Sequence, residues 1–236
     1  MIYGAMLAGG SGTRVKNAKV PKQFIEIKGC PIILYTLKNM LAAERFDAIY
    51  IAVHKDFLDY MNDAVARLIP QKDRVRIVLG GKERIDTIRN VTDAIIADNG
   101  LGGDDILVIH DAVRPFVTTK ILNDSIDCAI AHGAVVTALP ASDTILHSDD
   151  KQVVSEIPDR AKVFHGQAPD SFNLKLLIDL QNALTDEQRA VITGTSQICT
   201  FNNHPLYMIE GDAINFKITT DSDLLIVNSI INEQAE

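Results

Sequence analysis

The sequence predicts an α/β fold: a doubly wound, mostly parallel sheet with helices on both faces and an inserted β-arm. Short apolar runs have the length and composition of buried strands, and they lie at residues 2–7, 48–53, 75–79, 105–109 and 134–138. Longer amphipathic stretches separate these runs, and residues 84–97 carry apolar side chains at helical spacing. Strands that alternate with helices at this rhythm form a parallel sheet. Ligands of such sheets bind beyond the carboxyl ends of the strands, where this chain has glycines and charged residues.

The other elements come in chain order. We expect helices over residues 31–43, 56–68 and 120–131, the first with a proline in its opening turn. At residues 142–167 the chain becomes polar, with only short apolar pieces. We interpret this segment as a hairpin arm inserted into the sheet, with a plain long loop as the alternative, because structureless segments longer than ~15 residues are uncommon in compact domains.

Beyond the arm, the chain is expected to return to the sheet. A helix should start near Asn173, and strands should come next at residues 206–209 and 216–218. The closing helix has Thr220 as its expected N-cap, with Asp223 supporting it from the first turn. We therefore expect residues 1–236 to form one domain.

Composition limits the possible partners. The net charge is −8, so the surface as a whole repels nucleic acids and anionic membranes, and a phosphate-bearing ligand needs a local cluster of Lys and Arg. The three cysteines lack the spacing of a disulfide framework or a zinc site. The apolar start of the chain is interpreted as a buried strand rather than a signal peptide, and no apolar run reaches the ~20 residues of a membrane span. We expect a cytoplasmic protein.

A glycine-rich loop comes after the first strand, with the candidate nucleotide-binding residues Ala8, Gly9, Gly10, Gly12 and Thr13. Glycines allow backbone amides to approach an anion without obstruction by side chains. The loop matches neither the Walker pattern nor the dinucleotide fingerprint, because Val15 stands where the latter needs a third glycine. Taken alone, the loop could also be a flexible turn.

Two candidate catalytic cations accompany the loop, Arg14 and Lys22, the second directly after Pro21. Nucleotidyl transfer depends mainly on charge positioned in this way. At this point the chain resembles the Rossmann-like nucleotidyltransferases, and among them the cytidylyltransferases that make CDP-methylerythritol or CDP-ribitol.

The resemblance extends over nearly the whole chain. Residues 80–87 are similar to the family's Gly-Gly-x-x-Arg-x-x-Ser/Thr segment, which implies that the cytosine ring is bound by Gly80, Gly81, Arg84 and Thr87. Residues 110–115 resemble the His-Asp-Ala/Ser-x-Arg-Pro signature. That match implies nucleotide contacts from Asp111 and Ala112, Mg²⁺ on Asp111, and Arg114 close to the substrate.

Later matches imply the rest of the site. Lys217 aligns with a catalytic lysine near the triphosphate, and the acceptor substrate would meet Thr144, Arg160 and Thr193. Arg160 stands where the family has a basic residue that crosses a dimer interface. The resemblance therefore implies a homodimer with exchanged arms. The chain departs from the family at Ala168, where a threonine is usual, and at Gly194, where an acidic residue is usual.

The resemblance implies transfer of CMP from CTP to a polyol phosphate, with Mg²⁺ as cofactor. Residues 157–160 and 166–172 look like the ribitol 5-phosphate branch, which is the acceptor that we expect, and 2-C-methyl-D-erythritol 4-phosphate is the alternative. A non-catalytic nucleotide-binding protein is a further alternative, to which the two departures give some support. Sugar-1-phosphate transfer and dinucleotide-dependent oxidation fit the motifs less well.

Overall fold

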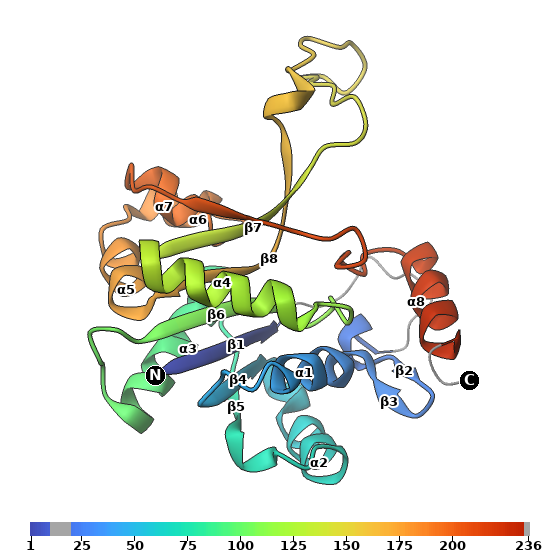
Figure 1. Ribbon diagram of the computed structural model, residues 1–236, viewed down its shortest axis with the longest axis vertical. Helices are drawn as coiled ribbons and strands as arrows, with labels where there is room; N and C mark the ends of the chain where they lie inside the picture. Colours follow the sequence, from blue (N-terminus) through green and yellow to red (C-terminus); the bar gives the residue numbers. More distant parts are fainter. Residues whose placement is uncertain (10–19, 234–236) are drawn as a thin grey trace.

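The computed structural model describes residues 1–9 and 20–233, and these form a seven-stranded sheet with helices on both faces (Figure 1). The strand order is β5-β4-β1-β6-β8-β7-β9. All neighbouring pairs are parallel except those made by β8, which runs antiparallel to β6 and β7. The strand bounds are β1 (Ile2–Ala8), β4 (Ala48–Val53), β5 (Val75–Leu79), β6 (Ile106–Asp111), β7 (Ala134–Pro140), β8 (Phe164–Asn173) and β9 (Tyr207–Glu210). The expected fold class is confirmed.

Alternation along the strands produces two apolar layers, one on each face of the sheet. In β1, Met6 faces a core completed by α1 (Ile32–Ala42), α2 (Leu58–Leu68) and α4 (Thr119–His132). Its neighbour Ala5 faces the opposite core, which α3 (Arg84–Asn99), α5 (Leu174–Asn182) and α7 (Gln197–Phe201) complete. The same alternation continues in β6, where Val108 joins the first core and Ile109 the second.

A third apolar cluster lies beside the sheet. It joins α8 (Asp221–Glu233) to the small sheet of β2 (Glu26–Ile27) and β3 (Cys30–Pro31), and it includes Val113 and Ile218. This cluster holds the segment before α8 against the turn after β6, because the Ile218 amide donates to the Val113 carbonyl at 3.0 Å. The segment carries Lys217.

Helix starts agree with the expected capping chemistry. The Asn173 side chain accepts from the Leu176 amide and begins α5. At α8, the Asp223 amide donates to the Thr220 hydroxyl, and the Asp223 carboxylate accepts from the Thr220 amide in return. Short helices not expected from the sequence are α6 (Asp186–Val191), α7 and the 3-10 turns η1 (Lys22–Phe24), η2 (Lys55–Phe57), η3 (Lys72–Arg74) and η4 (Arg160–Lys162).

The structure corrects the sequence interpretation in the second half of the chain. Residues 216–218 form no strand, and β8 was not expected. Within the segment 142–167, residues 164–167 already belong to β8. The rest forms an arm that projects from the sheet (Figure 1), and its regular structure is limited to η4 and an isolated bridge between His147 and Glu156. Within the described ranges, no helix is long and apolar enough to cross a membrane.

Candidate active site

The carboxyl ends of β1, β5 and β6 meet at one edge of the sheet, because these strands run parallel in a common layer. The turns after β1 and β5 lie close together there. A β-carbon added at Gly80 would lie 3.5 Å from the Gly9 Cα and 3.2 Å from the Val53 carbonyl oxygen. Glycine at position 80 therefore lets two backbone segments approach each other beside the candidate nucleotide site.

The turn from β5 into α3 is built around Gly81 and Thr87. The Gly81 amide donates to the Thr87 hydroxyl at 3.0 Å, and that hydroxyl donates to the Glu83 carbonyl. Glu83 and Asp86 form a capping box at the start of α3. A β-carbon on Gly81 would lie 2.3 Å from the Asp86 Cβ, so only glycine fits. The Thr87 hydroxyl, expected to contact a base, therefore also holds the turn together.

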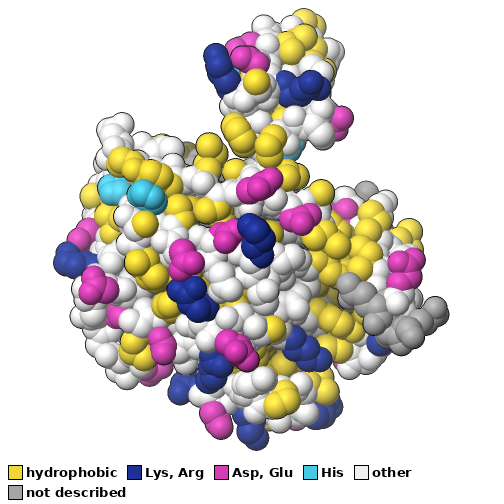
Figure 2. Space-filling view, in the orientation of Figure 1, with side chains coloured by type: hydrophobic (Ala, Val, Ile, Leu, Met, Phe, Trp, Pro, Cys, Tyr) yellow, Lys and Arg dark blue, Asp and Glu magenta, His cyan; other side chains and the backbone are white. Residues whose placement is uncertain are grey.

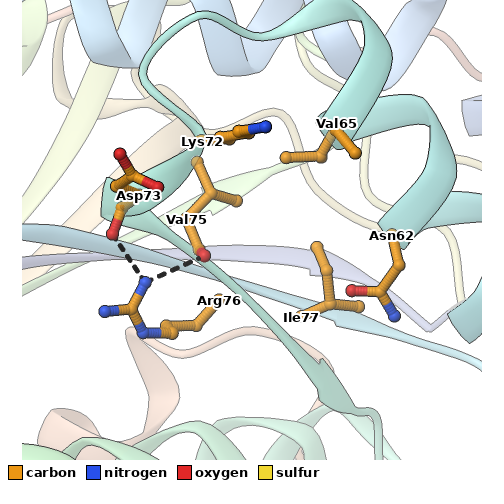
Figure 3. Close-up of a pocket in the computed structure, with 8 residues that line it drawn as sticks. Asn62, Val65, Lys72, Asp73, Val75, Arg76 and Ile77 are labelled. Carbon is orange, nitrogen blue, oxygen red and sulfur yellow. Dashed lines mark hydrogen bonds between the residues drawn. The ribbon is translucent and has the colours of Figure 1, made fainter.

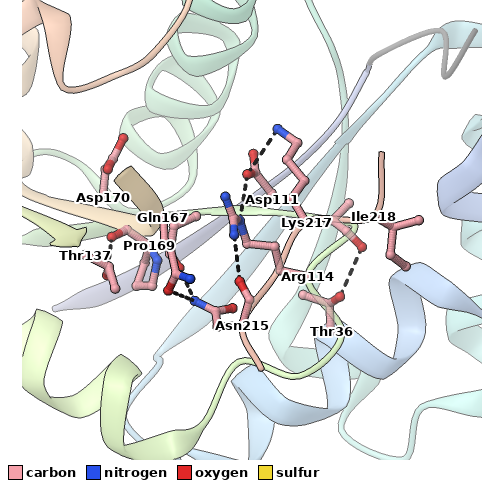
Figure 4. Close-up of polar contacts among 12 residues, drawn as sticks. Thr36, Asp111, Arg114, Thr137, Gln167, Pro169, Asp170, Asn215, Lys217 and Ile218 are labelled. Atoms are coloured by element: carbon pink, nitrogen blue, oxygen red, sulfur yellow. Dashed lines mark hydrogen bonds and ion pairs between the residues drawn. The ribbon is translucent and has the colours of Figure 1, made fainter. Parts of the chain in front are cut away.

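Asp111, at the end of β6, is the centre of the site. Its Oδ1 accepts from Arg84 Nη1 at 3.1 Å, and its Oδ2 accepts from Arg114 Nε at 3.1 Å and pairs with Lys217 Nζ at 3.2 Å. Figure 4 shows Arg114 and Lys217 pointing toward this carboxylate. The side chain of Asp111 is only 9% exposed. The structure thus brings together an acidic residue and three cations that are far apart in the sequence.

The three cations determine the ionisation of this carboxylate. Burial alone raises the pKa of Asp111, but Arg84, Lys217 and Arg114 together hold the pKa well below its usual range. The neighbouring His110 points to the other face of the sheet, where burial lowers its pKa to about 4. Asp111 is therefore a permanent anion at neutral pH, and His110 is a neutral side chain.

A hydrogen bond connects Lys22 to the segment that carries Lys217. Lys22 is buried in η1, and its Nζ donates to the Ile218 carbonyl at 2.6 Å. Its neighbour Gln23 donates to the Ala8 carbonyl at 2.7 Å, next to the glycine-rich loop. These contacts place Lys22 between the end of β1 and the segment that carries Lys217.

Asn215 connects that segment to the sheet. It is fully buried, and its side-chain amide donates to the Ala168 carbonyl at 2.7 Å. Its own carbonyl accepts from Arg114 Nη1 at 2.6 Å (Figure 4). Gln167 bonds to the neighbouring Asp212 through both its amide nitrogen and its oxygen. β8 therefore anchors the segment that carries Lys217, although the sequence analysis did not expect this strand.

Several predicted site residues are not at Asp111 in this chain. Thr144 and Arg160 are exposed on the projecting arm, and the Arg160 guanidinium donates to the Ser142 carbonyl of the same arm. Thr193 is exposed and donates to the Gln197 side chain. Gly10, Gly12, Thr13 and Arg14 lie outside the described residues.

Two residues beside Arg84 were missed by the sequence analysis. Thr195, rather than Thr193, accepts from Arg84 Nε at 3.3 Å, and it is fully buried. Asp170, on β8, is buried next to the same loop, where Ser196 donates to it at 3.4 Å. A carboxylate thus lies beside residues 195–196, one residue beyond the glycine at 194 where an acidic residue was expected.

The donor set accommodates Mg²⁺ only with ligands from a substrate. No cluster of three or more His, Cys, Asp or Glu side chains suited to a metal is found among residues 1–9 and 20–233. Magnesium at phosphate-transfer sites is held by one or two carboxylates together with substrate phosphates and water. Asp111 fits the role of the single carboxylate at such a site.

A hollow of about 470 Å³ lies between α2 and the start of β5 (Figure 3). The guanidinium of Arg76 there is occupied by the carbonyls of Asp73 and Val75. This hollow is at the amino end of β5, away from the edge where ligands of parallel sheets bind. We therefore assign the candidate active site to the surroundings of Asp111.

Comparison with known proteins identifies the family of the chain. The family model described as "IspD: 2-C-methyl-D-erythritol 4-phosphate cytidylyltransferase" matches residues 2–233. The structure resembles 4-diphosphocytidyl-2C-methyl-D-erythritol synthase from Anaerococcus prevotii DSM 20548, with 25% identity, a TM-score of 0.80 and 98% of each chain covered.

Two further solved structures have the same fold. The 2-C-methyl-D-erythritol 4-phosphate cytidylyltransferase of Francisella tularensis is 23% identical, with a TM-score of 0.80 over 97% of this chain and 98% of that one. The bifunctional IspDF of Campylobacter jejuni is 22% identical, with a TM-score of 0.75 over 95% of this chain and 53% of that one. The chain belongs to the 2-C-methyl-D-erythritol 4-phosphate cytidylyltransferase family, and it is a nucleotidyltransferase enzyme that uses CTP.

Proposed function

We propose that this enzyme transfers CMP from CTP to 2-C-methyl-D-erythritol 4-phosphate and releases pyrophosphate. The observation that carries the chemistry is the convergence of Arg84, Arg114 and Lys217 on Asp111 at the carboxyl edge of the sheet. This local positive charge can hold a triphosphate on a protein whose net charge is −8.

In the reaction, an oxygen of the acceptor phosphate attacks the α-phosphorus of CTP. A new P–O bond forms as the bond to pyrophosphate breaks, and the leaving group carries away the electron pair. A phosphate monoester is largely ionised at neutral pH, so no protein base is needed. Lys22 and Lys217 supply charge that stabilises the transition state, together with Arg14 from the glycine-rich loop.

Magnesium is the proposed cofactor, with Asp111 as its protein ligand. When bound, it neutralises charge on the triphosphate. The chain's own contribution is to keep Asp111 ionised and correctly oriented, since Arg114 fixes one carboxylate oxygen from a side chain that is itself buried.

Two acceptors compete for the assignment. The family model's description supports methylerythritol phosphate. Residues 157–160 and 166–172 support ribitol 5-phosphate, which is the second candidate. Methylerythritol 4-phosphate differs from ribitol 5-phosphate by a methyl branch and by the placement of hydroxyl groups. One methyl group lets an enzyme discriminate between two substrates by only ~1–3 kcal/mol, or roughly 10–200-fold.

The acceptor can be identified by measuring pyrophosphate release from CTP and Mg²⁺ with each polyol phosphate at equal concentration. We expect the higher kcat/KM with methylerythritol 4-phosphate, and UTP in place of CTP serves as the nucleotide control. A higher value with ribitol 5-phosphate would replace the first candidate with the second and leave the mechanism of transfer unchanged.

We also propose that the enzyme is a homodimer in which arms are exchanged. The arm projects away from its own sheet, and it exposes apolar side chains (Figure 2), namely Leu146, Val153, Val154 and Ile157. Exposed apolar groups concentrated on a thin projection favour a protein partner that covers them. In such a dimer, Arg160 would reach the partner's site.

Hybrid dimers test this arrangement. Arg160→Ala and Lys22→Ala subunits should each be poorly active alone, because one lacks the donated arm residue and the other lacks its own catalytic cation. A mixture should recover part of the activity, since some hybrid sites combine an intact arm with an intact Lys22. A monomer in sedimentation velocity, or a mixture no more active than its parents, would contradict the exchange.

A further inference from the structure

Asp170 is a buried acidic residue to which the mechanism above gives no role. In β8 it lies directly opposite Ile109 of β6, and paired residues of antiparallel strands share a face of the sheet. Asp111 is two residues beyond Ile109 and shares that face as well. The register therefore places the two carboxylates on the side of the sheet where α3 begins with Arg84.

Arg84 is held at two points. Its Nη1 donates to Asp111 at 3.1 Å and its Nε donates to the Thr195 hydroxyl at 3.3 Å. A hydroxyl that accepts a hydrogen bond still has its own proton to donate. Thr195 is fully buried, and the Asp170 carboxylate is held beside this residue by a hydrogen bond from the neighbouring Ser196 hydroxyl at 3.4 Å.

The groups that shift the pKa of Asp170 lie on β6, on α3 and in the loop before α7. Burial raises its pKa to about 6; Asp111 on β6 acts in the same direction, while Arg84 on α3 and the hydroxyls of Thr195 and Ser196 lower it. Cys199 on α7 is neutral, since burial and Asp170 raise its pKa to about 11. Above pH 7, Asp170 is therefore mainly an anion near Arg84.

We propose that Asp170 is a positioning residue that acts through the Thr195 hydroxyl to hold the Arg84 guanidinium in the orientation that binds CTP. The relay runs from the Asp170 carboxylate to the Thr195 hydroxyl and on to Arg84 Nε. This inference rests on the proposed binding of CTP beside Arg84, and it does not depend on which acceptor is used.

The direction of the change in CTP affinity distinguishes this positioning role from a purely electrostatic effect of Asp170 on the site. Replacing Asp170 by asparagine removes a negative charge near a cationic site, which by itself would tighten the binding of a triphosphate. Loss of the charged acceptor has the opposite effect, because an amide oxygen accepts a hydrogen bond more weakly than a carboxylate and therefore holds Thr195, and with it Arg84, less firmly. We expect Asp170→Asn to weaken CTP binding about tenfold, or about 1.4 kcal/mol, with kcat changed less than about threefold.

The experiment is calorimetric CTP titration, without acceptor, of the full-length enzyme and a set of variants. Thr195→Val should match Asp170→Asn, the double variant should be no weaker than either single variant, and Thr195→Ser should bind like the wild type because it keeps the hydroxyl. Thr92→Val is the matched control, since the hydroxyl of this buried threonine of α3 donates to the Arg89 carbonyl, within the helix. Thermal unfolding above pH 7 identifies any variant that is not folded.

Tighter or unchanged CTP binding in folded Asp170→Asn would overturn the inference, as would independent effects that multiply in the double variant. If Asp170→Asn does not fold, the comparison of Thr195→Val with Thr195→Ser decides in its place: equal affinities would refute the relay. Failure of the wild type to release pyrophosphate with any acceptor would instead refute the proposed function, and the CTP titrations would still judge the role of Asp170.

Discussion

Replacement of Asp111 by asparagine should destabilise the fold as well as abolish activity. The change removes the one negative charge that pairs with Arg84, Arg114 and Lys217 together, and it turns a side-chain amide toward them. The Arg114 side chain is only 9% exposed, whereas that of Lys217 is 34% exposed. Most of the cost should therefore come from leaving Arg114 buried without its counter-ion.

The size of the effect depends on that burial. Removing one partner of a buried ion pair costs about 3–5 kcal/mol, while an exposed pair contributes about 0–1 kcal/mol. Because Arg114 keeps its hydrogen bond to the Asn215 carbonyl, we expect the lower end, about 3 kcal/mol. For a domain of this size, that corresponds to a Tm lower by roughly 6–12 °C.

The pH dependence of the same variant adds a second check. Asp111 has a folded pKa below its unfolded pKa, so its stabilisation is complete above the unfolded value of about 4 and is lost as pH falls through the folded value. The difference in unfolding free energy between wild type and Asp111→Asn should thus be constant from about pH 8 to about pH 5 and narrow only below about pH 4.

The assay is urea unfolding monitored by circular dichroism, with calorimetry for Tm. Asp127→Asn is the control, because Asp127 pairs with Arg45 at the surface and its loss should cost less than about 1 kcal/mol. An Asp111→Asn variant as stable as this control, or one whose deficit grows toward low pH, would refute the view that the cluster is a buried ion-pair network.

Three further outcomes are expected. Gly81→Ala should bind CTP at least about tenfold more weakly, because the new β-carbon overlaps the α3 backbone, and calorimetry should show no such loss for Gly103→Ala, where nothing lies within 4 Å. Lys22→Ala should reduce kcat by roughly 10²–10³-fold while changing CTP affinity much less, and steady-state kinetics showing near-normal turnover would remove Lys22 from the catalytic centre. Cys199, fully buried with a pKa raised to about 11 by burial and Asp170, should react with a thiol reagent only after unfolding; labelling of the native protein at this residue would argue against its placement.

The first half of the fold could be predicted because each element there has a strong local signal. β1, β4 and β6 are buried on both faces, so they appear as continuous apolar runs. β8 has no such signal: Gly166, Pro169 and Asp170 all have low strand propensity. Its pairing with β6 and β7 overrides that propensity, and a short stretch of sequence does not show which strands will pair with each other.

Residues 216–218 show the opposite case. They alternate like a strand, but the backbone groups of Ile218 bond to the isolated partners Lys22 and Val113 rather than to a neighbouring strand. The apolar side chain of Ile218 joins the cluster under α8 instead. A local sequence pattern therefore cannot distinguish a strand paired in a sheet from an extended, half-buried segment that bonds to isolated partners.

The site was predictable where its residues come directly after strand ends. Asp111 and the turn containing Gly81 were identified from motifs beside expected strands, and the structure places both at the carboxyl edge of the sheet. Asp170 and Thr195 were not identified, because their positions depend on the register of β8 and on the loop before α7. Motif spacing identifies residues at the end of a strand, whereas only tertiary pairing determines which residues of other elements lie beside them.

The arrangement around Asp111 addresses a problem that any triphosphate site faces. Three like charges held close together repel each other, and without a counter-ion their side chains would separate before substrate arrived. Asp111 pairs with all of them within 3.2 Å, so the cations are already gathered at the point where phosphates would bind. A triphosphate and its Mg²⁺ must then compete for these same contacts, and each cation needs a second contact that survives the exchange. Arg114 has the Asn215 carbonyl, and Arg84 has the Thr195 hydroxyl, which we propose is supported by Asp170. On this reasoning, the second carboxylate lies at Arg84 because that guanidinium would otherwise lose its position when the substrate engages Asp111.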